Sequence, residues 1–194
     1  MLPHLEAAYA EPHRRYHTRR HVEDCLDKLA GVDGLSGRDR RLLERAIWWH
    51  DAVYDPTRND NEERSAELAE QDLPALGSPP DEIAEVARLI RLTRGHEVEP
   101  GDRLGGVLVT IDLSILGAPP AAYDAYARAI REEYDHVPDA AFRTGRAQIL
   151  RRFLEGPILP LPDLFPGLEA RARENLRREL ASLAGEEPPP PDHG

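Results

Sequence analysis

Apolar residues recur every three or four positions along most of the chain, which is the spacing that lines one face of an α-helix. Between 14 and 30, for example, Val22, Cys25 and Leu29 follow this spacing, and Gly31 ends the run. Later runs also stop at glycine or proline, which interrupt helices. The pattern predicts helices over 14–30, 38–54, 61–72, 80–94, 104–115, 120–135, 138–153 and 168–183.

The segment 104–115 contains enough β-branched residues, such as Val107 and Val109, to compete as a strand. We favour a helix there because Leu104 and Leu108 begin a series with the longer, helical period. No other segment has the alternation of a convincing strand. The predicted fold is therefore all-α, a bundle of about seven to nine helices with no significant sheet.

The helical pattern continues without a linker or an internal repeat, so we predict a single domain over residues 1–184. A chain of 194 residues is long enough for one domain with a hydrophobic core. The end of the chain, 185–194, is rich in proline and glutamate. Such a composition buries too little apolar surface to fold, so we expect this tail to be disordered.

The composition excludes several classes of partner. A net charge of −11 argues against non-specific binding to nucleic acid or to an anionic membrane. No apolar run reaches the roughly 18 residues of a membrane span, and the first residues lack the apolar run of a signal peptide. Cys25 is the one cysteine, so no intramolecular disulfide exists. This fits a reducing compartment, and we expect a cytoplasmic protein.

Four polar residues interrupt the apolar faces of three predicted helices: His21, the pair His50-Asp51, and Asp112. Singly, each could be a core residue with a hydrogen-bond partner. Together, two imidazoles and two carboxylates suit one divalent ion such as Mn, Fe, Co, Ni, Zn or Mg. Neighbours on a helix are about 100° apart around its axis, so His50 and Asp51 can reach the same ion.

In this order the four residues resemble the H…HD…D signature of the HD-domain phosphohydrolase superfamily, whose core is a bundle of helices. Further stretches resemble a bacterial group described as predicted metal-dependent HD phosphohydrolases: 16–21, 50–55, 61–66 and 124–134. The resemblance implies an enzyme in which His21, His50, Asp51 and Asp112 bind one metal ion. It further implies that a metal-activated water hydrolyses a phosphate ester of a nucleotide or another small molecule.

The general base is open at this point, although Asp51 belongs to the predicted catalytic set as well as to the ligands. Related nucleotidases have a glutamate three residues after the aspartate of the HD pair, where this chain has Tyr54. Asp55 matches the second acid of the Glu-Asp pair in the stringent-response alarmone hydrolases. Glu62 is the other candidate, although it also suits the first turn of a helix, where an acid favours the dipole.

Four further residues are predicted to bind the substrate. His17 shares a helix face with His21, and His96 is the one histidine between 52 and 111. Arg128 and Arg131 lie three apart on the helix after Asp112 and could bind phosphate. The alternatives are an exposed loop histidine for His96 and a solvated helix face for the two arginines.

The expected partner is a small phosphorylated substrate, such as a nucleotide, and a homodimer stays open. Two other functions remain as alternatives. Some HD proteins are di-iron oxygenases, but a second metal would need more histidines than His96 supplies between the HD pair and Asp112. The other alternative is a non-catalytic helical ligand-binding module in which the metal is structural.

Overall fold

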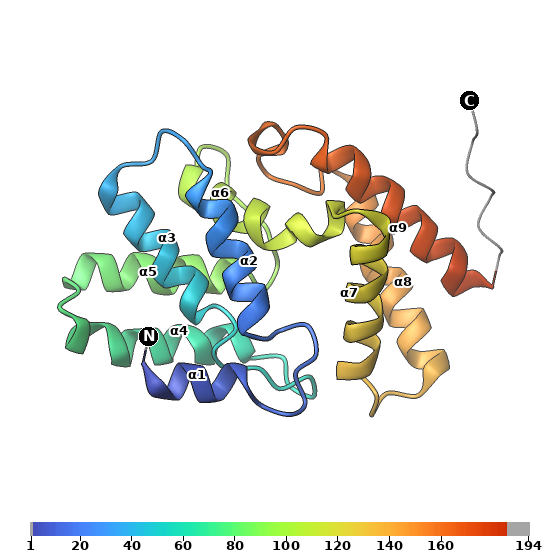
Figure 1. The fold of residues 1–194 in the computed structure, drawn as a ribbon, viewed down its shortest axis with the longest axis horizontal. Coiled ribbons are helices and arrows are strands. Elements are labelled where there is room, and N and C mark those ends of the chain that lie inside the picture. The colour runs from blue at the N-terminus through green and yellow to red at the C-terminus, as the bar shows by residue number, and fades with distance from the viewer. Residues whose placement is uncertain (1, 186–194) are drawn as a thin grey trace. The chain divides into compact units, whose positions relative to one another are not determined.

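The computed structural model describes residues 2–185, and every regular element in that range is helical (Figure 1). It contains nine α-helices, joined in places by short 3₁₀ helices, and no strand within the described residues. The all-α prediction is therefore confirmed. The predicted disordered tail, 185–194, lies outside the described residues except for Gly185.

Close packing divides the chain into two compact units, Met1–Asp112 and Leu113–Gly194. The division falls between two consecutive helical segments, where neither a loop nor a change in composition marks it in the sequence. The first unit contains α1 (Pro3–Tyr9), α2 (Arg19–Ala30), α3 (Gly37–Trp49), α4 (Asn61–Asp72), η1 (Leu73–Leu76), α5 (Pro80–Leu92) and α6 (Arg103–Asp112). The second contains η2 (Leu113–Gly117), α7 (Pro120–Glu133), α8 (Asp139–Glu155), η3 (Pro162–Leu164) and α9 (Leu168–Ala184).

The largest differences from the sequence prediction in the first unit are one missed helix and two helix ends. Helix α1 was not predicted, because it is only 7 residues long and offers too few apolar repeats. Helix α2 begins at Arg19 instead of residue 14, and α3 ends at Trp49 instead of residue 54. The two stretches left outside these helices, 14–18 and 50–54, contact each other through hydrogen bonds from the Arg14 side chain.

Helix α6 is the centre of the first unit, where it packs against α2, α3 and α5. Every residue from 105 to 111 is buried, which explains why this helix is apolar on all sides and rich in β-branched residues. The preference for a helix over a strand is confirmed. A Cβ at Gly105 would lie 2.8 Å from Leu92 Cδ1 and against the Asp102 carboxylate, so a larger residue would displace the start of α6.

The second unit has its own core, which includes Tyr123, Leu150 and Leu176. The Asn175 amide of α9 donates hydrogen bonds of 2.9 Å to the carbonyls of Leu116 and Ala118, which ties α9 to the end of η2. Helices α8 and α9 also pack against each other. The unit therefore has apolar and polar contacts that involve its own residues alone.

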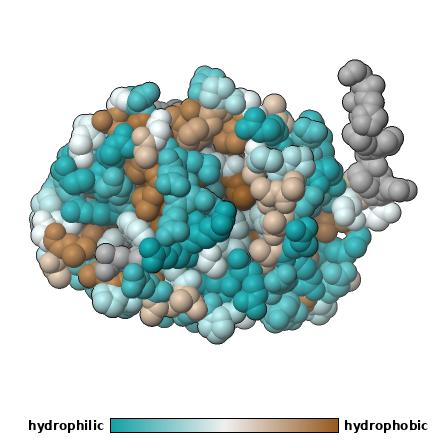
Figure 2. All heavy atoms as spheres, in the orientation of Figure 1, coloured by the Kyte–Doolittle hydropathy of each residue, from teal (hydrophilic) through white to brown (hydrophobic). Residues whose placement is uncertain are grey.

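The surface offers little exposed apolar material. Figure 2 shows mainly hydrophilic side chains on the face that it presents, with scattered apolar ones. Among the described residues, the exposed large hydrophobic side chains are Leu76 and Ile149. In the same part of the chain, no single helix has the length and hydropathy to cross a membrane. Two segments, Arg103–Gly117 and Pro120–Glu133, reach those values only when they are taken together across the break between them.

Candidate metal centre

The first unit brings the four predicted ligands together from three helices. His21 lies in the first turn of α2, His50 and Asp51 follow the last residue of α3, and Asp112 is the last residue of α6. Both imidazoles are buried, with 4% and 2% of their side chains exposed, whereas Asp51 and Asp112 are 18% and 15% exposed. The cluster is thus buried on the imidazole side and reaches solvent on the carboxylate side.

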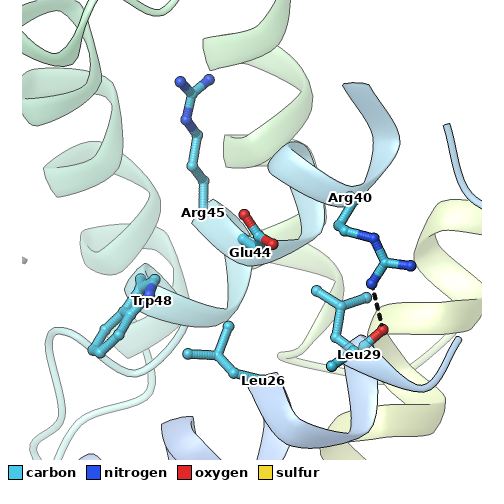
Figure 3. Close-up of a pocket in the computed structure, with 7 residues that line it drawn as sticks. Leu26, Leu29, Arg40, Glu44, Arg45 and Trp48 are labelled. Carbon is cyan, nitrogen blue, oxygen red and sulfur yellow. Dashed lines mark hydrogen bonds between the residues drawn. The ribbon is translucent and has the colours of Figure 1, made fainter. Parts of the chain in front are cut away.

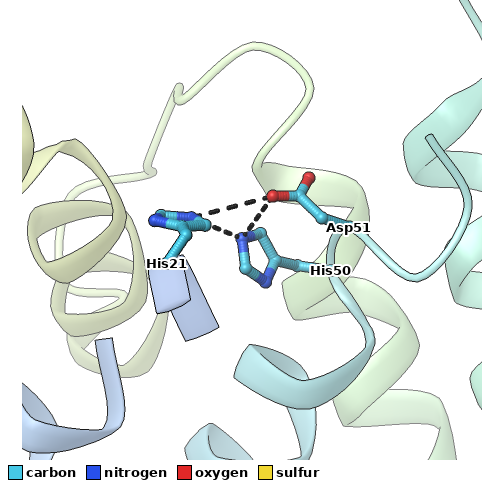
Figure 4. A group of neighbouring side chains, drawn as sticks. All are labelled: His21, His50 and Asp51. Carbon is cyan, nitrogen blue, oxygen red and sulfur yellow. Dashed lines mark hydrogen bonds and ion pairs between the residues drawn. The ribbon is translucent and has the colours of Figure 1, made fainter. Parts of the chain in front are cut away.

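The ligand atoms of the cluster lie within a few ångströms of one another. The Nε2 atoms of His21 and His50 are 3.1 Å apart (Figure 4). Asp51 Oδ2 lies 3.0 Å from His50 Nε2 and 3.7 Å from His21 Nε2. Asp112 Oδ1 lies 3.1 Å from His21 Nε2 and 3.6 Å from His50 Nε2. Both carboxylates therefore meet the same pair of imidazole nitrogens.

These separations fit a shared divalent ion. Adjacent ligand atoms at about 2.0–2.4 Å from one ion are about 2.8–3.9 Å apart, for octahedral or tetrahedral geometry. The distance between the two imidazole nitrogens and the four distances from them to the carboxylate oxygens run from 3.0 to 3.7 Å and fall inside that range. Two nitrogens and two oxygens form a mixed donor set that suits Mn, Fe, Co, Ni, Zn or Mg. The described side chains can therefore hold a metal ion.

The backbone fixes the orientation of the His50 ring. His50 Nδ1 lies 2.8 Å from the carbonyl oxygen of Ile47, in the last turn of α3. Because a carbonyl oxygen can only accept, Nδ1 carries the proton of the neutral ring. The lone pair of Nε2 then faces the cluster, which is the arrangement that metal-binding histidines need.

The acids and the imidazoles of the cluster each favour the charged form of the other. Burial opposes the ionisation of Asp51 most strongly, yet the attraction of His50 and then of His17 lowers the pKa of that carboxyl below its usual range. Burial acts likewise on Asp112, where hydrogen bonds with three imidazoles outweigh it and hold the pKa well below normal. For His50, burial disfavours the charge, but Asp51 and Asp112 raise its pKa well above normal. The buried acids thus attract positive charge to this point.

Arg14, which the sequence analysis did not single out, fixes the segment that follows His50. Its Nη1 donates to the carbonyl oxygens of Asp51 (2.6 Å) and His17 (3.1 Å), and its Nη2 donates to that of Ala52 (3.1 Å). The side chain is fully buried, and its guanidinium lies 5.2 Å from the centre of the Tyr9 ring. These bonds give the Asp51 and Ala52 carbonyls, which follow α3, partners outside a helix.

The amides of the same segment bind α4 on the other side. The Val53 amide donates to Ser65 Oγ at 3.0 Å, and the Asp55 amide donates to Asn61 Oδ1 at 3.1 Å. The Asn61 amide group in turn donates to the Asp55 carbonyl at 2.9 Å. Residues 51–55 are therefore not helical, contrary to the prediction over 38–54, and their backbone is fixed by side chains from both neighbours.

The two candidate bases have different surroundings. The Asp55 carboxylate accepts hydrogen bonds from the Thr57 hydroxyl (2.6 Å) and amide (2.9 Å), which lower its pKa and account for it as a turn residue. Glu62 lies in the first turn of α4 and is half-buried. Within residues 2–185, its carboxylate has no hydrogen bond or ion pair. It precedes Ser65 by three residues and so shares the helix face that binds Val53.

Two of the predicted substrate-binding residues lie beside the cluster. The His17 ring stacks on the Tyr54 ring at 4.2 Å and meets the His21 ring edge-on at 6.2 Å. His96 Nε2 lies 3.2 Å from Asp112 Oδ2, and its side chain is 25% exposed. The alternative of His96 as an exposed loop histidine is therefore wrong, because the side chain reaches a cluster carboxylate.

Arg128 and Arg131 belong to the second unit. Arg128 is exposed on α7. Arg131 donates to the carbonyl oxygens of Tyr134 (2.7 Å) and Val137 (3.2 Å), and its guanidinium lies 4.7 Å from the centre of the Phe142 ring. Arg131 thus stabilises the C-terminal end of α7. A phosphate-binding role for either arginine stays a prediction.

A hollow between α2 and α3, with a volume of about 640 Å³, does not include the cluster (Figure 3). Arg40, on its wall, donates to the Leu29 and Val32 carbonyls at the end of α2, at 2.7 and 2.8 Å. Arg45, also on the wall, pairs with Glu82 at 2.7 Å. The two arginines that line the hollow thus join neighbouring helices.

No family model, curated protein or solved structure matches the chain. The resemblance to the HD superfamily therefore rests on the residues themselves. The resemblance depends on the order of His21, His50-Asp51 and Asp112 along the chain. The fold adds that these four side chains converge.

Proposed function

We propose that the protein is a metal-dependent phosphohydrolase of the HD type, which hydrolyses a phosphate ester of a nucleotide or another small molecule. The observation behind this proposal is the convergence of two imidazole nitrogens and two carboxylate oxygens from separate helices. The order of these residues along the chain matches the HD signature. The carboxylate side reaches solvent, as a metal site must if it is to meet a substrate.

His21, His50, Asp51 and Asp112 would hold the ion. A divalent ion in such a site neutralises phosphoryl oxygens and makes a bound water more acidic. The Ile47 carbonyl orients the His50 ring, and Arg14 holds the backbone at Asp51. Since these groups are fixed before a substrate arrives, little reorganisation is needed during the reaction.

Glu62 is the stronger of the two candidates for the general base. A general base needs a carboxylate that is available to accept a proton, and hydrogen bonds to a carboxylate make it less basic. Thr57 provides two such bonds to Asp55. Glu62 has none within the described residues, and it shares the face of α4 that contacts the segment after Asp51.

His17 is placed to bind or orient the substrate. Its ring lies between the Tyr54 ring and the His21 ring, and its charge contributes to the low pKa of Asp51. An imidazole beside a metal-bound phosphate can donate a hydrogen bond to a phosphoryl or leaving-group oxygen. The expected substrate is thus a small phosphorylated molecule whose phosphate faces the cluster.

The test is an elemental analysis of the purified protein, followed by a hydrolysis screen of nucleotides and other phosphate esters with several divalent ions. Asp51→Asn should lose metal and hydrolysis while its circular-dichroism spectrum stays helical, because the amide has no negative charge for the ion. Asp81→Asn, at an aspartate with 71% of its side chain exposed, should behave as the wild type. Unchanged turnover in Asp51→Asn would contradict the proposal.

The two alternatives give different results in the same experiment. A di-iron oxygenase would contain two irons per chain and would consume oxygen. A structural metal would leave the wild type inactive on the whole panel, while its removal would unfold the first unit. The partial exposure of Asp51, Asp112 and His96 favours a catalytic over a structural metal, since structural sites are closed.

A further inference from the structure

His96 has a backbone conformation that side chains rarely adopt. Its φ is +56°, and it is the one non-glycine residue with a positive φ in the part of the chain that the structure describes. The residue follows α5, and its amide donates to the Leu92 carbonyl at 2.9 Å, as in a helix C-terminal cap. Glycine is the usual residue at such a position because it has no Cβ. Here Gly95 is the preceding residue, and histidine occupies the strained position.

The strained backbone brings the His96 side chain to the cluster. Its Nε2 lies 3.2 Å from Asp112 Oδ2, while Asp112 Oδ1 lies 3.1 Å from His21 Nε2. One oxygen of the carboxylate thus faces the two buried imidazoles, and the other faces His96. With 25% of its side chain exposed, His96 is more open to solvent than any of the four ligands.

We propose that His96 is a positioning residue, which holds Asp112 so that one carboxylate oxygen points at the metal. This inference rests on the proposed metal site. Hydrogen bonds from outside the coordination sphere fix the rotation of ligand carboxylates, and their loss typically weakens metal binding by about 10–100-fold. Strain at a residue that reaches a site is common where its side chain has a function.

Two substitutions separate the effect of the His96 side chain from the effect of its backbone conformation. His96→Gly and His96→Ala both remove the imidazole, but only glycine relaxes the positive φ. We expect both variants to bind Mn²⁺ or Zn²⁺ about 10–100-fold more weakly in competition with a chromophoric chelator. In the absence of metal, His96→Gly should melt at a higher temperature than His96→Ala. His96→Gln, which keeps a donor, should recover part of the affinity.

A matched control exists in the same unit. His4 Nε2 lies 2.7 Å from Asp72 Oδ2, a contact between the same two residue types away from the cluster. His4→Ala should therefore leave metal affinity unchanged. Wild-type affinity in both His96→Gly and His96→Ala would overturn the inference.

The Co²⁺ absorption spectrum distinguishes a positioning residue from a ligand. At saturating Co²⁺, the spectrum of His96→Gln should match that of the wild type, because the ligands are the same. A changed spectrum would show that His96 binds the ion and would overturn the positioning role. If the wild type binds no divalent ion, the proposed function fails and this inference fails with it. If the wild type binds an ion and the His96 variants bind it with the same affinity, only the inference fails.

Discussion

Each of the two units contains a buried group of polar side chains, and the charges of the two groups are paired in different ways. In the second unit, Arg146 donates to both oxygens of Glu179 at 2.7 and 3.1 Å, and the Tyr123 hydroxyl donates to the same carboxylate. Arg146 and Glu179 are 9% and 12% exposed. A permanent cation, a carboxylate and a hydroxyl complete this group without any ligand.

Within residues 2–185, no arginine or lysine pairs with the carboxylates of the cluster in the first unit. Asp51 and Asp112 face imidazoles, which are positive only when they are protonated. Accordingly, the two acids raise the pKa of His50. A buried group that attracts a proton in this way also suits a divalent cation. The difference indicates that the Arg146 group stabilises its unit, whereas the His-Asp cluster can hold a cation.

The largest expected effect is on catalysis at Glu62, the candidate base of the first unit. Glu62→Gln should reduce kcat by about 10²–10⁴-fold, the usual contribution of a general base, with little change in thermal stability. Its neighbour Glu63, which pairs with Arg91 on the surface, provides the control: Glu63→Gln should keep full activity. Steady-state kinetics on the best substrate of the screen checks this. If Glu62→Gln retains wild-type kcat while Asp55→Asn loses it, Asp55 is the base instead.

The Arg146 group should respond in stability and not in metal binding. Arg146→Met leaves Glu179 buried without its cation and should cost about 3–5 kcal/mol of unfolding free energy in urea. The double variant Arg146→Met/Glu179→Leu removes both charges and should recover most of that loss. Metal affinity should be the wild-type value in both. A marked loss of metal affinity in Arg146→Met would contradict the division between the two groups.

Arg14 should affect both quantities, because it contacts the backbone of a ligand. Arg14→Met removes hydrogen bonds to three carbonyls, one buried and two part-buried, which should cost about 1–3 kcal/mol of stability. We expect metal affinity to fall about 10-fold, in the range of other supporting interactions. Arg40→Met is a matched control, since Arg40 also donates to two carbonyls of the first unit but contacts no ligand. Equal metal affinity in the two variants would remove the link between Arg14 and the cluster.

The smallest expected effect is that the amount by which metal stabilises the fold changes with pH. The folded pKa of His50 lies above its unfolded value of about 6.5, so its proton stabilises the metal-free fold below that pH. This stabilisation is lost as the pH rises through the folded pKa. The contribution of Asp51 and Asp112, whose pKa values are lowered, is lost only below about pH 3.9.

A bound ion replaces the His50 proton, so the difference in melting temperature with and without metal should widen as the pH rises toward the folded pKa of His50. One displaced proton corresponds to at most about 1.4 kcal/mol per pH unit. Calorimetry at a fixed excess of metal measures this difference. A difference that stays constant, or that shrinks as the pH rises, would contradict the exchange of metal for a proton.

The residue types along the chain predicted the helices and the buried histidines better than the contacts between segments. Helical periodicity located α6, and the burial of His21 and His50 follows from the same spacing. The boundaries at Arg19 and Trp49 did not follow, because tertiary hydrogen bonds between segments far apart in the sequence decide them. Periodicity describes only local structure.

Arg14 and His96 show the same limitation in the site. Arg14 stands in a charged stretch beside Arg15, where nothing in the sequence distinguishes a buried arginine from an exposed one. His96 follows Gly95, so the sequence suggests a loop, and only the fold places its side chain on Asp112. A histidine directly after a glycine at a helix end, between two ligand positions, is the one local signal that could have indicated its contact with Asp112.

The central claim is that the four converging atoms bind one divalent ion. Crystals soaked in Mn²⁺ and measured for anomalous scattering test it most directly. We predict one strong peak within about 2.0–2.4 Å of His21 Nε2, His50 Nε2 and the carboxylates of Asp51 and Asp112. The peak should be absent from Asp51→Asn crystals. A wild-type map without a peak at this position, at a saturating Mn²⁺ concentration, would contradict the claim.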